Sequence, residues 1–155
     1  MLLAGLEQAR SRFGRCDPGT DEAFYAIFEA LAWIGAIRDR LSLDGVDPPA
    51  IIDGLYYMRN VVLHQGADVL YWLLISSGKL GTASLGTMKF GGGSLPRKPQ
   101  WPAVGQFTPP RPPRTGEKEY ETMLAGKSVV ATLNDATSSL RVWGLSGDST
   151  EGVRS

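Results

Sequence analysis

The stretch EAFYAIFEALAWIGAIRDRLSL, residues 22–43, decides the fold class of this chain. Its apolar side chains recur every three or four residues, at Phe24, Ile27, Phe28, Leu31, Ile34, Ile37 and Leu41. This 3.6-residue period is typical of an amphipathic helix that buries one face. Thr20 or Asp21, just ahead of it, can cap the first turn with a side-chain oxygen. The sequence therefore predicts a long helix over residues 22–43.

Two further helical patterns flank this stretch. Residues 2–15 have an apolar stripe that ends near Gly14, and residues 50–76 have a longer one. Asp47 is placed to cap the longer helix, with a proline at its first position. The apolar residues of that helix are Ile51, Ile52, Leu55, Met58, Val62, Leu63, Val69, Leu70 and Leu73. Short links between long helices favour antiparallel neighbours, so we expect an all-α antiparallel helical bundle.

The composition changes between residues 77 and 116, which are rich in Gly and Pro and show neither helical nor strand periodicity. A short strand pair around 79–90 is one reading of its first part. Trp101 and Phe107 suggest that a later part packs across the bundle. The PPRPPR run that ends at Arg114 favours polyproline II, as a stiff spacer or as a docking peptide for another protein.

Helical patterns return near the C-terminus. Residues 117–125 read as a short helix stopped by Gly126, and Ser128 can cap another. That helix has an apolar stripe of Val129, Leu133, Ala136, Leu140 and Trp143. The predicted organisation is a bundle core over residues 1–76, a Gly/Pro-rich excursion over 77–116, C-terminal helices over 117–143 that complete the same domain, and a flexible tail over 144–155.

Composition limits the classes of function. The 155 residues are 43% hydrophobic and carry sixteen basic and sixteen acidic side chains, so no net charge draws the chain to nucleic acid in general. Eleven of the cations are arginine, which leaves a local phosphate site open. Cys16 is the only cysteine, which favours a reducing cytoplasm. The longest apolar run, residues 69–75, is far below the roughly 20 residues that span a bilayer.

Several familiar sites are excluded by the residues present. One histidine and one cysteine cannot form a structural zinc site, and the acidic residues lack the spacing of an all-oxygen cage, so no metal is expected. Gly126-Lys127-Ser128 ends like a phosphate-binding loop, but Glu121 stands where that loop needs glycine, so no cofactor is expected either. Glu22 and Glu29 share a helical face, where a solvated or ion-paired role is favoured over paired acid–base catalysis.

The strongest candidate site is Arg59-Asn60-Val61-Val62-Leu63-His64, on the predicted third helix. Arginine offers a permanently charged fork for a phosphate, and histidine titrates near neutral pH. Arg59 and His64 are about 140° apart around a straight helix, whereas Asn60 and His64 share a face. Cleavage of RNA through its 2′-hydroxyl requires a base, an acid and a cation, and one chain supplies a single histidine. A catalytic site would therefore be shared by two copies in a homodimer.

An arginine followed by a polar residue and, four to six positions after the arginine, a histidine resembles the motif of the HEPN superfamily of helical domains. The matching residues are Arg59, Asn60 and His64, and the resemblance covers roughly residues 20–76. It implies a metal-independent endoribonuclease in which His64 is the acid–base residue, Arg59 stabilises the scissile phosphate and Asn60 orients them. Many HEPN proteins act in toxin–antitoxin pairs or phage defence, and others only bind or dimerise.

The whole pattern, including Trp101 and residues 116–133, also looks like uncharacterised helical proteins of actinobacteria and their phages. The expectation is thus a cytoplasmic homodimer that cleaves RNA and pairs with a cognate antitoxin or another protein partner. The alternative is a non-catalytic dimerisation or protein-interaction module, which predicts that the motif is buried and hydrogen-bonded.

Overall fold

The computed structural model describes residues 1–18, 20–65, 69, 98–107 and 115–143. Over these residues it contains five helices and no β-strand, which confirms the all-α prediction. The helices are α1 (Leu2–Phe13), α2 (Asp21–Leu43), α3 (Ala50–Gln65), α5 (Glu117–Met123) and α6 (Val129–Val142). Of the rest of the predicted third helix only Val69 is described, and the possible strands at 79–90, the 109–114 run and the tail lie outside the described residues.

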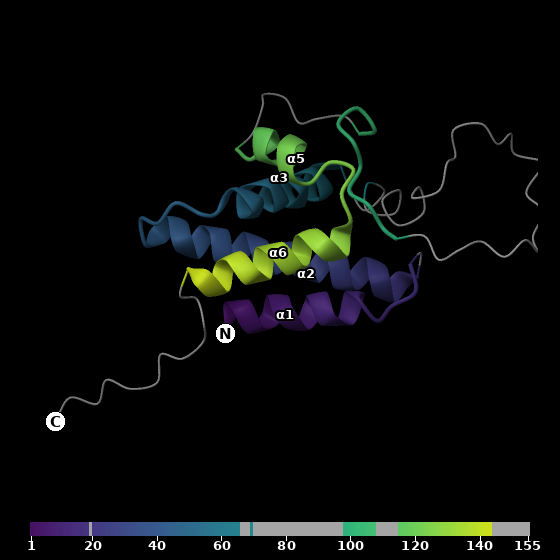
Figure 1. Cartoon of the computed structure of the whole chain (residues 1–155), viewed down its shortest axis with the longest axis horizontal. Coiled ribbons are helices and arrows are strands. Elements are labelled where there is room, and N and C mark those ends of the chain that lie inside the picture. The colour runs from purple at the N-terminus through teal and green to yellow at the C-terminus, as the bar shows by residue number, and fades with distance from the viewer. Residues whose placement is uncertain (19, 66–68, 70–97, 108–114, 144–155) are drawn as a thin grey trace, which may run out of the picture.

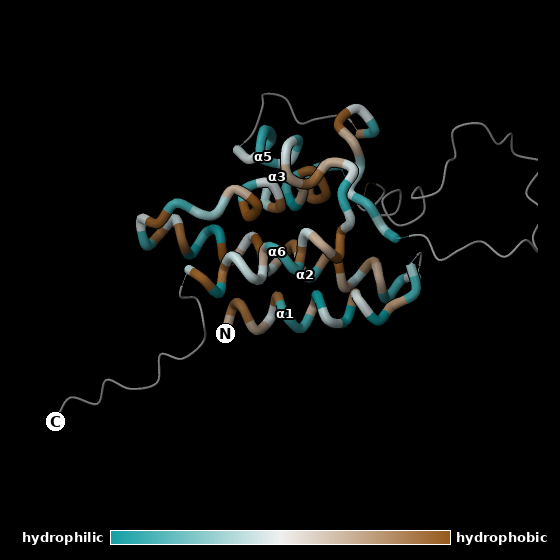
Figure 2. The backbone as a smooth tube through the Cα atoms, in the orientation of Figure 1, coloured by the Kyte–Doolittle hydropathy of each residue, from teal (hydrophilic) through white to brown (hydrophobic). Residues whose placement is uncertain are grey.

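Successive long helices run back and forth across the molecule (Figure 1). Helix α1 packs on α2, α2 packs on α3, and α6 contacts both α1 and α3. The short helix α5 lies on α3, at the opposite side of the molecule from α1. In Figure 2 the apolar positions of α1, α2, α3 and α6 are spaced at intervals along each helix, which is the pattern of one buried face per helix.

The three long patterns produce helices that begin close to their predicted positions, because each has an apolar stripe that becomes buried. Thr20, rather than Asp21, caps α2: its side-chain oxygen accepts a hydrogen bond from the backbone N–H of Ala23. Ser128 caps α6 in the same way through Ala131, as predicted. Ile27, Ile34 and Ile37 of α2 are almost fully buried. Glu29 forms an ion pair with Arg12 of α1 at 2.7 Å, the structural role favoured for it.

Residues 99–101 connect the Gly/Pro-rich region to the helical core. The backbone of Trp101 pairs with Lys127 and Gly126, and the carbonyl of Pro99 accepts from Val129. The Trp101 side chain is 1% exposed, and its indole N–H donates to Thr132 of α6 at 2.5 Å. Phe107, also predicted to pack, is partly buried and meets Tyr120 edge-on. The segment that carries Trp101 is therefore part of the core.

Helix α5 approaches α3 closely because two glycines stand at the contact. A Cβ atom on Gly54 would lie 2.8 Å from Leu124 and 3.1 Å from the backbone nitrogen of Tyr120. Gly116, with a left-handed φ of +90°, precedes α5, and a Cβ there would lie 2.0 Å from the Asp53 carbonyl oxygen. Tyr120 is fully buried in this contact, and its hydroxyl donates to the Pro102 carbonyl.

Three kinds of sequence prediction need correction. Helix α3 begins at Ala50, and the Pro49 carbonyl accepts from Ile52 and Asp53, so Asp47 precedes the cap position. Helix α5 ends at Met123, two residues early, and Gly126 then follows with φ +72°. Phe28, Leu63 and Trp143 were assigned to apolar stripes, yet they are 41%, 51% and 49% exposed. Each is therefore only partly covered by the described residues.

No helix in the described parts of the chain combines the length and the hydrophobicity that a membrane crossing requires.

Candidate functional site

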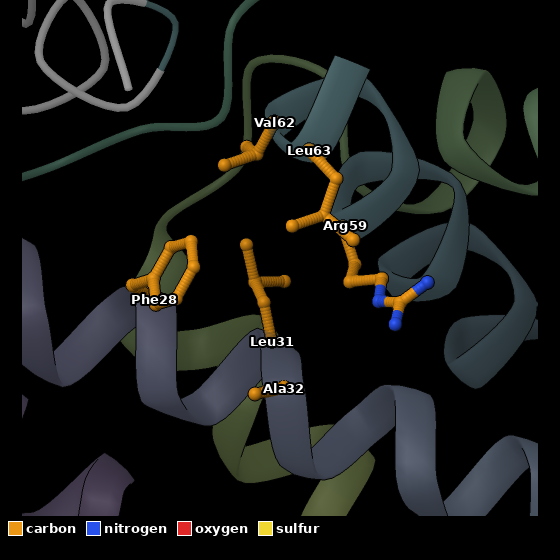
Figure 3. Close-up of a pocket in the computed structure, with 6 residues that line it drawn as sticks. All are labelled: Phe28, Leu31, Ala32, Arg59, Val62 and Leu63. Carbon is orange, nitrogen blue, oxygen red and sulfur yellow. The ribbon is translucent and has the colours of Figure 1, made fainter. Parts of the chain in front are cut away.

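Arg59 lies in the groove between α2 and α3. Its side chain is half-buried and passes over Gly35 of α2, where an added Cβ would lie 3.1 Å from the Arg59 Nε atom. The absence of a side chain at Gly35 lets the arginine lie close to the α2 backbone. The aliphatic part of Arg59 faces the apolar residues of the groove, while the guanidinium points away from Phe28 and Val62 (Figure 3).

Asn60 holds one end of that guanidinium. The Arg59 Nη1 atom donates to the Asn60 side-chain oxygen at 3.0 Å, and both residues are half-buried. The sequence placed Asn60 on the face of His64, yet within the described residues its recorded contact is with the arginine. Asn60 therefore fixes the direction of the arginine fork, which is a positioning role.

His64 lies one turn beyond Asn60 and is exposed to solvent. No hydrogen bond of His64 is recorded within the described part of the chain. Arg59 is turned against α2 whereas His64 is at the surface, so the two side chains are differently placed around α3, as the angle of about 140° requires. In one copy of the chain, the Arg59 and His64 side chains therefore do not face the same site.

Three residues missed by the sequence analysis surround Arg59. Two guanidiniums contact the Tyr56 ring: that of Arg38, 4.6 Å from the ring centre, and that of Arg59, 5.7 Å from it. Arg38 also pairs with Asp53 through Nε at 3.3 Å. Tyr56 precedes Arg59 by three positions and follows Asp53 by three, so helical spacing signals their common face. Arg38 comes from α2, and its position depends on how the helices pack.

A small pocket continues the groove on the other side of Arg59. Its volume is about 230 Å³, and Phe28, Leu31 and Ala32 of α2 line it together with Arg59, Val62 and Leu63 of α3 (Figure 3). Five of these six side chains are apolar, and Arg59 contributes the charge. The groove therefore offers an apolar compartment and a cationic cluster, joined by one arginine.

Behind this surface the other face of α3 is buried against α5. Burial raises the pKa of Tyr57 to about 12, and the nearby carboxylates of Glu117 and Glu121 add to the shift. Burial also raises the pKa of Tyr120, with a smaller contribution from Tyr57. Both phenols stay protonated at neutral pH and contribute no charge to the groove.

In the described ranges no group of three or more His, Cys, Asp or Glu side chains is arranged to hold a metal ion.

Comparisons of the chain with models of protein families, with curated proteins and with solved structures found no match.

Proposed function

We propose that this protein is a metal-independent endoribonuclease of HEPN type that acts as a homodimer, with Arg59 and His64 of two copies lining one cleft. Asn60 orients the arginine, Arg59 stabilises the charge that develops on the scissile phosphate, and His64 moves protons to and from the reacting oxygens. The four long helices form the HEPN-like bundle that presents this motif. A role in phage defence or in growth arrest with an antitoxin follows from the resemblance alone.

One observation supports this proposal most: Arg59 is held by Asn60 on the same helix that exposes His64. An arginine fixed by a neighbouring amide is preoriented for a phosphate, since its remaining N–H groups point in a set direction. An exposed histidine can reach a large substrate. The exposed apolar side chains of Phe28 and Leu63 beside the motif favour contact with a second copy.

RNA cleavage by the purified full-length chain, in the presence of EDTA, tests the enzyme directly. We expect wild type to cut single-stranded RNA, and Arg59→Ala and His64→Ala each to lower the rate by at least about a hundredfold. Asn60→Ala should lower it less, because the arginine loses its orientation but keeps its charge. Arg40→Ala is the matched control, since Arg40 is an exposed arginine paired with Asp44 away from the groove.

Light scattering on the same samples tests the shared cleft. A monomer at the concentrations where RNA is cut contradicts the composite site, and equal rates in wild type, Arg59→Ala and His64→Ala contradict catalysis by this motif.

The second candidate is a non-catalytic interaction module. The apolar surface around Tyr25, Phe28 and Leu63, which are 64%, 41% and 51% exposed, favours a protein partner. In that case the purified chain does not cut RNA, and Phe28→Ser, Arg59→Ala and His64→Ala each weaken dimer or partner binding.

A further inference from the structure

We infer that the groove between α2 and α3 binds a nucleotide unit of RNA, with the phosphate held by Arg38 and Arg59 and the base in the apolar pocket. The choice of RNA as ligand rests on the proposed function, whereas the binding groove and its test do not require cleavage.

The phosphate position follows from unused hydrogen-bond donors. Arg38 has its ion pair to Asp53 through Nε alone, and Arg59 uses Nη1 toward Asn60. No partner is recorded among the described residues for the two terminal amino groups of Arg38 or for Nη2 of Arg59. Half-buried arginine side chains whose terminal amino groups are unpaired favour an oxyanion, because a charge-assisted hydrogen bond is stronger than a neutral one.

Charge favours the same ligand. The group formed by Arg38, Arg59 and Asp53 holds two guanidiniums and one carboxylate, so it carries an excess of one positive charge. The Arg38 and Asp53 side chains are only 22% and 21% exposed, and screening by solvent is reduced accordingly. Both guanidiniums contact the ring of Tyr56, at 4.6 Å and 5.7 Å from its centre, so the two cations share one aromatic neighbour. We place the phosphate between them.

The adjacent pocket suits a base. Its volume of about 230 Å³ is below the roughly 300–1,000 Å³ of pockets for drug-sized ligands, so it accommodates a single ring system. Its lining is Phe28, Leu31, Ala32, Val62 and Leu63, which offer a ring face and aliphatic contact. These side chains have no polar group to read a base edge, so stacking and burial drive binding and the preference among bases is weak.

Arg59 links the two compartments. Its stem lines the pocket, and its guanidinium points away from the pocket (Figure 3). That guanidinium contacts the Tyr56 ring, which Arg38 also contacts. A nucleotide with its base beside the stem would carry its phosphate near the charged end. This arrangement makes Arg38 and Tyr56 binding residues of a site whose sequence motif contains neither.

The test measures binding of adenosine 5′-monophosphate, adenosine and inorganic phosphate to the full-length chain, by calorimetry and by NMR shifts. We expect adenosine monophosphate to bind more tightly than either fragment. Arg38→Ala should weaken it about tenfold to a hundredfold, since a charge-assisted hydrogen bond contributes about 1.5–3 kcal/mol and 1.4 kcal/mol is a factor of ten. Phe28→Ala should weaken the nucleotide and leave inorganic phosphate unchanged.

Asp53→Asn distinguishes a ligand-binding role of Arg38 from a purely structural role of its ion pair with Asp53. It breaks the same ion pair as Arg38→Ala, but it removes a negative charge beside the phosphate, so we expect tighter binding. If the pair were merely structural, both variants would weaken binding alike. Arg40→Ala and Asp44→Asn change an exposed pair on the same helix and serve as controls with unchanged affinity.

Equal affinities in wild type, Arg38→Ala and Asp53→Asn overturn the inference, as do equal affinities for the nucleotide and for phosphate. Nucleotide binding with the expected variant pattern but no cleavage of RNA contradicts the proposed enzyme and leaves the binding groove standing. If cleavage depends on Arg59 and His64 but Arg38→Ala and Phe28→Ala do not change nucleotide binding, the proposed enzyme is supported and the binding groove is contradicted.

Discussion

Two buried tyrosines whose rings contact each other at a tilt of 44° differ in the hydrogen-bond partner of the hydroxyl. Tyr57 and Tyr120 have ring centres 5.5 Å apart at the contact of α3 and α5, and both are fully buried. The Tyr120 hydroxyl donates to Pro102 at 2.6 Å, whereas the buried Tyr57 hydroxyl has no hydrogen-bond partner among the described residues. A buried polar group without a partner lowers the free energy of unfolding, whereas a hydrogen-bonded one raises it. The hydroxyls of Tyr57 and Tyr120 therefore affect stability in opposite directions.

Replacing each tyrosine by phenylalanine measures this difference. We expect Tyr120→Phe to lower the free energy of unfolding by about 0.5–1.5 kcal/mol, the usual contribution of one hydrogen bond. Tyr57→Phe should leave it unchanged or raise it, because an unpaired hydroxyl is removed from the interior. Urea unfolding followed by circular dichroism gives both values, and a larger loss for Tyr57→Phe than for Tyr120→Phe would contradict the assignment of partners.

At Gly35, substitution by alanine should affect the stability of the protein and the function of the site differently. An alanine at this helical position favours α2 by up to about 1 kcal/mol, but its Cβ would stand 3.1 Å from Nε of Arg59. The flexible arginine can yield, so we expect Gly35→Ala to keep or slightly raise the free energy of unfolding. The same shift should weaken RNA cleavage and adenosine monophosphate binding severalfold. Unchanged function in a stable Gly35→Ala protein would show that the arginine does not need its position over α2.

At the scale of elements, α5 depends on its neighbour. It has seven residues, too few for a helix that is stable alone, so its contact with α3 must hold it. That contact requires Gly116 at the turn before α5, where the backbone is left-handed and the Asp53 carbonyl fills the space of a side chain.

Gly116→Ala and Gly126→Ala form a matched pair. Both glycines have positive φ, which costs an alanine roughly 1–2 kcal/mol, but no atom lies within 4 Å of a Cβ on Gly126. At Gly116 the clash with the Asp53 carbonyl adds about 1–3 kcal/mol of overpacking. Chemical denaturation should therefore show a clearly larger loss for Gly116→Ala, and equal losses would mean that α5 does not rest on α3 as described.

Helices could be predicted from the sequence where the signal lies within the helix itself. Helices α2 and α6 follow from an apolar period and a capping hydroxyl, at Thr20 and Ser128, which the sequence displays directly. Exposure of Leu63 could not be predicted, because an apolar residue is buried only if a neighbour covers it. The contact of Arg38 with Tyr56 could not be predicted either, because it results from the packing of α2 on α3. Arg59, Asn60 and His64 were found as a motif, and their role stays a prediction.

At the scale of the whole molecule, a chain without net charge places two arginines and one carboxylate around Tyr56. The ion pairs recorded among the described residues all use arginine, at Arg12, Arg38, Arg40 and Arg141. Arginine stays protonated at every pH that the protein survives. These ion pairs therefore hold in mild alkali, and the buried tyrosines become the groups that make stability depend on pH there.

The direction of that dependence follows from the two raised pKa values. An unfolded tyrosine has a pKa near 10, whereas folding raises that of Tyr57 to about 12 and that of Tyr120 as well. Between these values the native state binds more protons than the unfolded state, so stability is full below pH 10 and falls as pH rises. The slope is at most about 1.4 kcal/mol per pH unit for each tyrosine. Urea unfolding at pH 9, 10 and 11 should show this decline.

Tyr120→Phe separates the buried phenols from other alkaline effects. Removing one of the two titrating hydroxyls should reduce the slope above pH 10, whereas Tyr25→Phe, at an exposed position, should leave it unchanged. Absorbance of tyrosinate at equilibrium gives an independent reading, because the buried phenols ionise together with unfolding. A free energy of unfolding that is constant from pH 9 to 11, or an equal slope in wild type and Tyr120→Phe, would mean that the contact of α3 and α5 does not keep these hydroxyls protonated.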